Sequence, residues 1–155
     1  MLFRSCDPSG IGIELTESAV LTDVTAATRH LEGVRRSNIR VALDDFGTGH
    51  SSLALLRSIP VDELKVDKSF VSGIGTDICD TAIIRATTAL GRDLGLRVVA
   101  EGVETLAQAG HLGNLQCDRA QGYLWSDAVP LGKLHTLVKR TYPVRSALDQ
   151  IPLRV

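Results

Sequence analysis

Two adjacent aspartates, Asp44 and Asp45, follow the apolar run Val41-Ala42-Leu43 and precede Gly47 and Gly49. Side chains alternate along a strand, so neighbouring carboxylates can face one site only where the strand ends or turns. In α/β proteins, the carboxyl ends of parallel strands are where ligands and metal ions bind. A solvated turn before Gly47 is the alternative interpretation of the same residues.

The elements that must position these acids follow from an alternation of strand and helix patterns. Strands are expected at 11–15, 40–43, 64–67, 96–100 and 119–122. Helices are expected at 23–36, 53–56, 80–94, 105–112 and 131–140, with Thr22 or Asp23 capping the first. This alternation implies right-handed crossovers and a parallel sheet, which is an α/β fold.

Polar residues recur where these strands end. They are Glu14 and Glu17, Asp44 and Asp45, Lys65 and Asp67, Glu101 and Glu104, and Gln121. Strands that carry polar groups at the same end form the active-site rim of a (β/α) barrel. The pattern therefore predicts one common site, laid out as in a (β/α) barrel, on about five parallel strands.

Composition limits the function classes. The chain has 155 residues, 44% of them hydrophobic, and a formal net charge of -1, which suits one globular domain. The near-neutral charge argues against DNA or RNA as a partner, because sequence-independent nucleic-acid binding requires excess Lys and Arg. We find no apolar run of the roughly 18–20 residues that a membrane-spanning helix needs, and no secretory signal.

The cysteines Cys6, Cys79 and Cys117 are odd in number and widely spaced. This usage fits a reduced protein without disulfides or a cysteine-based metal site, so we expect a cytoplasmic location. Buried or half-buried free thiols are the default expectation for all three.

Five stretches carry a family resemblance. They are Glu14-Leu15-Thr16-Glu17, Asp44-Asp45-Phe46-Gly47-Thr48-Gly49, residues 64–70, residues 98–104 and Gln121-Gly122-Tyr123. In order and spacing they resemble the successive motifs of the EAL domain over residues 11–140. The resemblance implies a TIM-like barrel that hydrolyses one phosphodiester bond of cyclic di-GMP with two divalent cations, Mg²⁺ or Mn²⁺.

Hard cations prefer carboxylate oxygens, and a pair of them can activate water and neutralise a phosphodiester. The resemblance implies that Glu14 and Asp44 are metal ligands and that Asp45 binds the second metal. For Glu14, an exposed carboxylate at a strand end is the alternative.

The resemblance also implies three catalytic residues. Lys65 would orient water or stabilise charge on the phosphate, although a lysine with its ammonium in water is the alternative. Glu101 would be a metal ligand or a general base. Gln121 would hold water or a phosphate oxygen, unless its side chain bonds only to backbone.

Two further acids match family positions close to the substrate. Asp67 lies near the metal-bound site in the family pattern. Glu104 would contact the site or cap the helix that begins near Thr105. Lys68 is expected on the surface.

A loop at residues 46–52 follows the aspartate pair. By resemblance Glu17 positions this loop, and Gly47 and Gly49 let it turn. Family members form dimers through it, so a homodimer is an expected assembly. His50 stands in this loop where the family usually has Tyr.

The chain also departs from the family at Ser126-Asp127-Ala128. The family commonly has a basic residue and Pro at the last two of these positions. Asp127 would oppose a bound phosphate, and Ala128 lacks the rigidity of Pro, so weaker substrate binding is expected.

The resemblance covers only the last five of the family's eight strands, so it implies a partial TIM-like (β/α) barrel, and a typical barrel has about 250 residues. Neither the Glu-Ala-Leu strand nor the next strand, which supplies an Asn ligand, is among these residues. We therefore expect an irregular start at 1–10, a truncated EAL domain at 11–142 and an irregular tail at 143–155. Weak metal binding and little activity would follow, and upstream signalling domains would complete the protein.

The alternatives to this function are a degenerate module that binds cyclic di-GMP or a protein partner, a non-functional remnant, and a barrel for another phosphate or carbonyl substrate.

Overall fold

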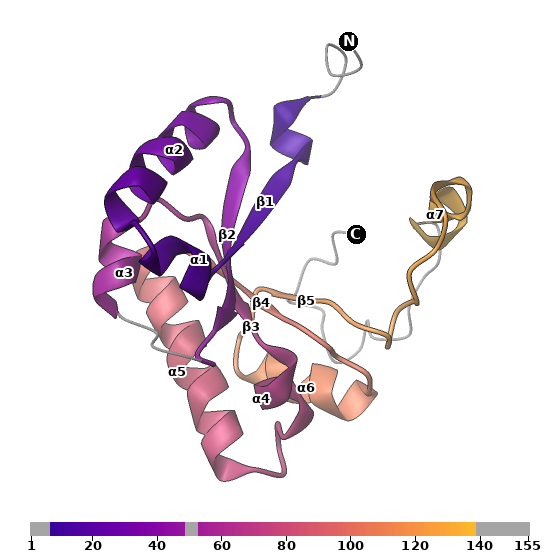
Figure 1. Ribbon diagram of the computed structural model, residues 1–155. Helices are drawn as coiled ribbons and strands as arrows, with labels where there is room; N and C mark the ends of the chain where they lie inside the picture. Colours follow the sequence, from indigo (N-terminus) through magenta and orange to yellow (C-terminus); the bar gives the residue numbers. More distant parts are fainter. Residues whose placement is uncertain (1–6, 49–52, 139–155) are drawn as a thin grey trace.

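A computed structural model describes residues 7–48 and 53–138. Its centre is a parallel sheet in which the strands follow one another in chain order (Figure 1). The strands are β1 (Gly12–Thr16), β2 (Arg40–Phe46), β3 (Glu63–Val66), β4 (Arg97–Ala100) and β5 (Arg119–Ala120). The predicted α/β fold with about five parallel strands is confirmed.

Helices connect the strands. They are η1 (Pro8–Gly10), α1 (Glu17–Leu21), α2 (Val24–Arg36), α3 (Leu53–Ser58), α4 (Lys68–Ser72), α5 (Ile78–Leu94), α6 (Leu106–Asn114) and α7 (Leu131–Val138). The short helices α1 and α4 were not predicted. Five residues make too few turns to show a helical period, so their sequences carry no clear signal.

Local capping explains where the longer helices begin. Asp23 caps α2 by accepting the N–H of Ala26. The predicted start of α5 at Asp80 is wrong, because Asp77 accepts the N–H groups of Cys79 and Asp80 and starts the helix at Ile78. Helix α5 ends at Leu94 and is followed by the C-cap Gly95, whose φ of 70° is the left-handed conformation that favours glycine.

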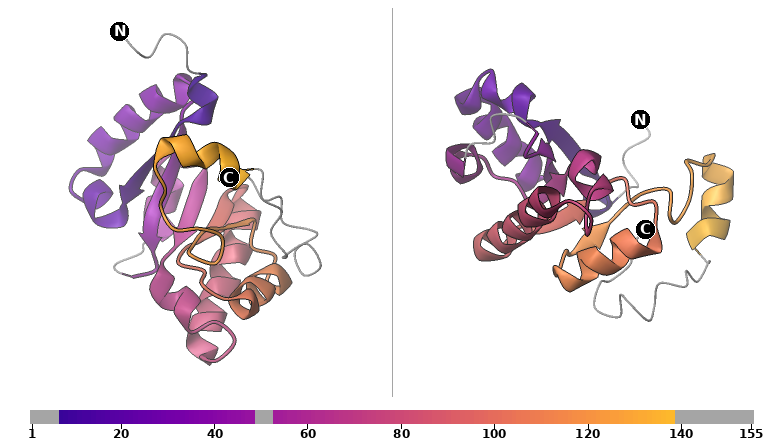
Figure 2. Two further views of the ribbon diagram at one scale, coloured as in Figure 1. Left: turned by 90° about the vertical axis from the view of Figure 1, so that its right-hand side faces the viewer. Right: turned by 90° about the horizontal axis from the view of Figure 1, so that it is seen from below.

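One face of the sheet is apolar and covered by helices (Figures 1 and 2). Alternate residues of β2, β3 and β4 point into this layer and have no exposed surface: Val41, Leu43, Leu64, Val66, Val98 and Ala100. Helix α7 stands apart from the others, on the opposite side of the sheet (Figure 2). Burial on the helix side fixes which side chains must point to the other face.

That other face, which we call the inner face, carries charge at both ends of the strands. At the amino ends, Glu63 Oε1 receives ion pairs from Arg40 at 3.5 Å, Arg97 at 2.9 Å and Arg119 at 3.1 Å. These contacts join β2, β3, β4 and β5 in one register. Lys65 lies two residues beyond Glu63 and so points to the same face, at the opposite end of the strands.

The cysteines divide by position. Cys117 is buried, as expected, whereas Cys79 is exposed at the start of α5, so the expectation of burial was wrong for that thiol. Cys6 lies outside the described residues. None of the helices that the structure describes combines the length and apolar character needed to cross a bilayer.

Candidate active site

The aspartate pair occupies an irregular stretch of β2. The strand continues through both residues to Phe46, so the expected strand end at residue 43 was wrong. The pairing of β2 with β3 shifts register between Leu43 and Phe46, and Asp45 has a φ of 55°. An extra residue in one strand is a β-bulge, which re-aims side chains. The bulge, rather than the end of the strand, lets both carboxylates reach one site.

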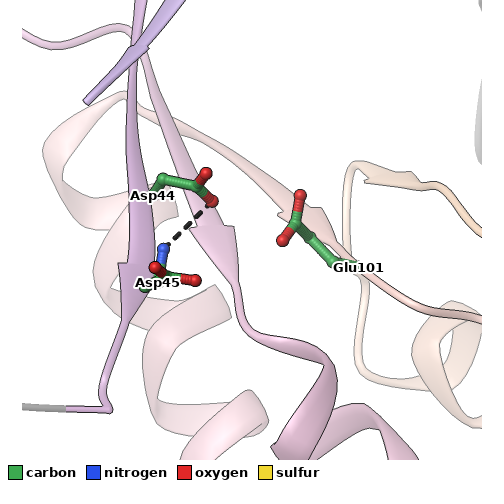
Figure 3. A group of neighbouring side chains, drawn as sticks. All are labelled: Asp44, Asp45 and Glu101. Carbon is green, nitrogen blue, oxygen red and sulfur yellow. Dashed lines mark hydrogen bonds between the residues drawn. The ribbon is translucent and has the colours of Figure 1, made fainter. Parts of the chain in front are cut away.

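The two aspartates meet Glu101, which follows β4 (Figure 3). One carboxylate oxygen from each of Asp44, Asp45 and Glu101 lies within 4.8 Å of the others, and all three residues are half-buried. We call these three residues the acid cluster. Converging carboxylate oxygens suit a hard divalent cation such as Mg²⁺ or Mn²⁺, so the residues fit the metal requirement that the sequence predicted.

Lys65 connects the acid cluster to a fourth acid. Its Nζ lies 3.2 Å from Asp44 Oδ1, 2.5 Å from Glu101 Oε1 and 2.7 Å from Glu14 Oε2. The lysine side chain is only 5% exposed, so the alternative of an ammonium in water is wrong. Burial acts to lower the pKa of Lys65, but the hydrogen bonds to Glu101 and Glu14 outweigh it and raise that pKa above its ordinary value.

Glu14 reaches this group from the edge strand β1. Its side chain is 54% exposed, yet it accepts the Lys65 hydrogen bond, so it faces the site as well as solvent. Glu14 is therefore an exposed strand-end carboxylate that lies beside the acid cluster, and its role as a metal ligand stays a prediction.

Gln121 extends the site towards β5, which ends one residue before it. Its Nε2 donates a 2.6 Å hydrogen bond to Glu101 Oε1, so the alternative of a glutamine bonded only to backbone is wrong. Burial raises the pKa of Glu101, the contact with Lys65 opposes this, and the charges of Asp44 and Glu14 add to it. The net rise in pKa is the direction that a general base at neutral pH requires.

A shallow hollow lies beside Glu101 and Gln121. It is also lined by Lys68, Glu104, Tyr123 and Ser126. Sequence reasoning did not single out Tyr123 or Ser126 as site residues. Tyr123 belongs to the Gln-Gly-Tyr motif. It lines the hollow and is 70% exposed, so its aromatic ring is open to contact from a ligand.

The two predicted substrate-binding acids lie in different places. Glu104 lines the hollow, and the alternative that it caps α6 is wrong, because Thr105 caps that helix and Gln108 completes a capping box. Asp67 instead caps α4 by accepting the N–H of Ser69 at 2.9 Å. Partial burial acts to raise the pKa of Asp67, but the hydrogen bonds from Ser69 lower it overall.

The loop-positioning residues are described in part. Glu17 is buried at the start of α1. Gly47 has a φ of 99°, and a Cβ there would lie 3.1 Å from the Phe70 ring, so the turn depends on glycine. Gly49 and His50 lie outside the described residues, so the role of Glu17 in holding this loop stays a prediction. Lys68 is exposed, as expected.

With this geometry established, comparisons identify the family. A family model described as "EAL domain" matches residues 2–128. The chain belongs to the EAL domain family. The match starts before the boundary expected at residue 11, and the three-part division of the chain stays a prediction.

Relatives of known structure share the fold. The bifunctional diguanylate cyclase/cyclic di-GMP phosphodiesterase MucR of Pseudomonas aeruginosa is 42% identical over 134 residues, 86% of this chain. A structure of the MucR phosphodiesterase in complex with c-di-GMP superposes with a TM-score of 0.79 over 84% of this chain, at 42% identity. Klebsiella pneumoniae BlrP1, solved as a manganese and cyclic di-GMP complex, has a TM-score of 0.74 over 79% of this chain, at 36% identity.

The EAL domain is a TIM barrel, and the five strands described here correspond to part of it. The chain spans 20% of the length of MucR and 53% of the solved MucR phosphodiesterase chain. For BlrP1 the share is 31%.

Proposed function

We propose that this chain supplies the carboxyl-terminal part of a cyclic di-GMP phosphodiesterase domain. The observation that carries the proposal is the convergence of Asp44, Asp45 and Glu101 within 4.8 Å. Asp44 and Asp45 belong to β2, whereas Glu101 directly follows β4, which is not a neighbour of β2, so only folding brings the three together. Bound c-di-GMP in the related MucR structure supports the choice of substrate.

In this proposal, Asp44, Asp45, Glu101 and Glu14 hold divalent cations. A pair of such cations supplies a hydroxide at neutral pH and neutralises the phosphodiester. Manganese in the related BlrP1 complex supports Mn²⁺, and Mg²⁺ has the same preference for oxygen ligands.

The remaining residues would act on the water and the substrate. Gln121 carries both a donor and an acceptor, so it can orient a water molecule beside Glu101. Glu101, with its raised pKa, can take a proton from that water. Lys65 provides positive charge where negative charge develops on the phosphate. Glu104 and Tyr123 line the hollow in which the dinucleotide would lie.

We propose that the chain alone is a weak catalyst. The sequence contains neither the Glu-Ala-Leu strand nor the Asn ligand of the family. In addition, the side chain of Glu14 is 54% exposed, so water competes for this ligand. The loss of one transition-state contact costs on the order of 10²–10³ in rate. A cytoplasmic location, a homodimer and upstream signalling domains belong to the same proposal.

A second candidate is a degenerate module that binds cyclic di-GMP without cleaving it. Asp127 and Ala128 favour this candidate, because both are exposed just after Ser126, which lines the hollow. A carboxylate there repels phosphate rather than attracting it. Binding without turnover would then be the retained activity.

The test measures both binding and hydrolysis of cyclic di-GMP in Mn²⁺, using the chain and its Asp44→Ala variant. Linear dinucleotide produced by the chain and lost in Asp44→Ala supports the phosphodiesterase proposal. Saturable binding without product supports the second candidate. Hydrolysis that survives Asp44→Ala contradicts the assignment of the site. The absence of both binding and hydrolysis contradicts both candidates.

A further inference from the structure

Lys65 Nζ occupies the point at which three carboxylates converge, from β1, from β2 and from the residue directly after β4. It lies 2.5 Å from Glu101, 2.7 Å from Glu14 and 3.2 Å from Asp44. Two of these acids belong to the acid cluster that fits a divalent cation. The ammonium and a cation would therefore draw on the same carboxylates.

The charges around Lys65 do not balance. Three carboxylates contact one ammonium, so two negative charges remain when all four groups are ionised. The lysine side chain is 5% exposed, and the side chains of Asp44 and Glu101 are 21% and 17% exposed. Like charges in such a partly buried place repel one another more strongly than in water. The ammonium relieves part of that repulsion.

We propose that Lys65 is a built-in counter-cation that competes with the divalent metal for Asp44, Glu101 and Glu14. This inference rests on the proposed function, because it takes the acid cluster to be the metal site. A carboxylate that pairs with Lys65 cannot at the same time give its full negative charge to a metal ion. Metal binding is therefore expected to displace the ammonium from at least one of these carboxylates.

The competing interpretation is that Lys65 only holds the acids in place for the metal. The two interpretations predict opposite changes in metal affinity when Lys65 is removed. A lysine that positions the acids increases metal affinity, so its removal weakens binding. A lysine that competes lowers metal affinity, so its removal strengthens binding.

The experiment measures the dissociation constant of Mn²⁺ by electron paramagnetic resonance on the chain and its Lys65→Met variant. Met removes the charge and keeps an unbranched side chain of similar length. We expect Lys65→Met to bind Mn²⁺ at least about tenfold more tightly, because unit charges a few ångströms apart interact strongly at a partly buried site. Equal or weaker binding by Lys65→Met overturns the proposal.

Two controls separate local competition from a general change in net charge. Lys133→Met makes the same change on the exposed surface of α7 and should leave the Mn²⁺ affinity unchanged. Adding Asp44→Asn to Lys65→Met should remove the gained affinity. An equal gain in Lys133→Met, or a gain that survives Asp44→Asn, overturns the proposal.

Loss of the buried ammonium could also destabilise the fold, so circular dichroism is followed during heating with and without Mn²⁺. A ligand that binds only the folded state raises the melting temperature in proportion to its binding energy. We expect a larger rise with Mn²⁺ in Lys65→Met than in the unchanged chain, even if the variant is less stable without metal. A smaller rise contradicts competition.

The same data distinguish the two proposals. The proposed metal site fails if Asp44→Asn does not weaken Mn²⁺ binding by the unchanged chain. The competition fails, while the metal site stands, if Asp44→Asn weakens binding and Lys65→Met also weakens it. If Lys65→Met binds no Mn²⁺ at all, the competition is contradicted, because removing the ammonium has not freed the acids.

Discussion

The backbone N–H of Asp45 donates a hydrogen bond to Oδ1 of its neighbour Asp44 at 3.0 Å. This contact accompanies the left-handed conformation of Asp45, whose φ is 55°. Asp and Asn adopt this conformation more readily than other residues with a side chain, and glycine adopts it without strain. The bulge that directs both carboxylates to one site therefore depends on the type of residue at position 45.

Two substitutions at position 45 separate backbone strain from charge. Asp45→Ala and Asp45→Gly both remove the carboxylate, but only glycine tolerates the positive φ. We expect the alanine variant to be less stable than the glycine variant by about 1 kcal/mol. Urea denaturation followed by circular dichroism measures this difference, and equal stability of the two variants would contradict the bulge geometry.

Two glutamates three residues apart in sequence should differ in their effect on metal binding. Glu101 belongs to the acid cluster, whereas Glu104 is exposed and only lines the hollow. We expect Glu101→Gln to weaken Mn²⁺ binding by at least about tenfold, because the loss of even a group that only supports the ligands typically costs that much. Glu104→Gln makes the same charge change and should leave that affinity unchanged. Calorimetric titration tests both variants, and equal effects would show that net charge rather than the cluster controls affinity.

Gly122 should resist even a single added methyl group. A Cβ at this position would lie 2.2 Å from the Val103 carbonyl oxygen and 2.3 Å from its nitrogen, which are backbone atoms that cannot move freely. We expect Gly122→Ala to lower the free energy of unfolding by about 1–3 kcal/mol.

Gly110 in α6 is the matched control, because nothing lies within 4 Å of a Cβ there. Alanine is favoured over glycine inside a helix, so Gly110→Ala should raise stability by roughly 0.5–1 kcal/mol. Chemical denaturation of both variants gives the comparison. A tolerated Gly122→Ala would mean that the backbone at Gln121 is not packed against Val103.

Cys117 and Cys79 should react differently with a thiol reagent. In a Cys6→Ser background, Ellman's reagent at pH 8 should modify exposed Cys79 quickly and buried Cys117 only after unfolding. Burial raises the pKa of the Cys117 thiol from 9.0 to about 11, so few reactive thiolates form in the folded state. Rapid modification of two thiols in the folded protein would contradict this burial.

The raised pKa of Cys117 also predicts how the stability of the fold depends on pH. The folded state keeps the Cys117 proton more tightly than the unfolded state, so unfolding is favoured as pH rises. The contribution of this thiol should therefore fall between pH 9 and about pH 11 and then level off. The loss is on the order of 3 kcal/mol. Cys117→Ala should show a correspondingly flatter stability profile over this range, and an unchanged slope would contradict the assignment.

The general layout of the site could be predicted from sequence because it depends on strand ends. Apolar runs place Leu43, Leu64 and Val98 against the helices, and this burial sends Lys65 to the inner face. The parallel sheet then brings residues such as Asp44 and Glu101 to the same end. Local patterns alone were sufficient for these conclusions.

Details that arise from contacts between strands were beyond sequence reasoning. The bulge at Asp45 depends on a shift in pairing between β2 and β3, which no motif signals. Likewise, Asp67 matched a family position near the metal, but its side chain caps α4. The three-way contact of Lys65 depends on the spacing of four strands, so its competition with a cation became visible only in the structure.

The most direct test of the central claim is a crystal structure of the chain soaked in Mn²⁺, with anomalous diffraction used to locate the ions. The account predicts a manganese peak bound by carboxylate oxygens of Asp44, Asp45 and Glu101, with the Lys65 ammonium displaced from at least one of them. Manganese bound elsewhere, or an acid cluster that stays free of metal at saturating Mn²⁺, would contradict it.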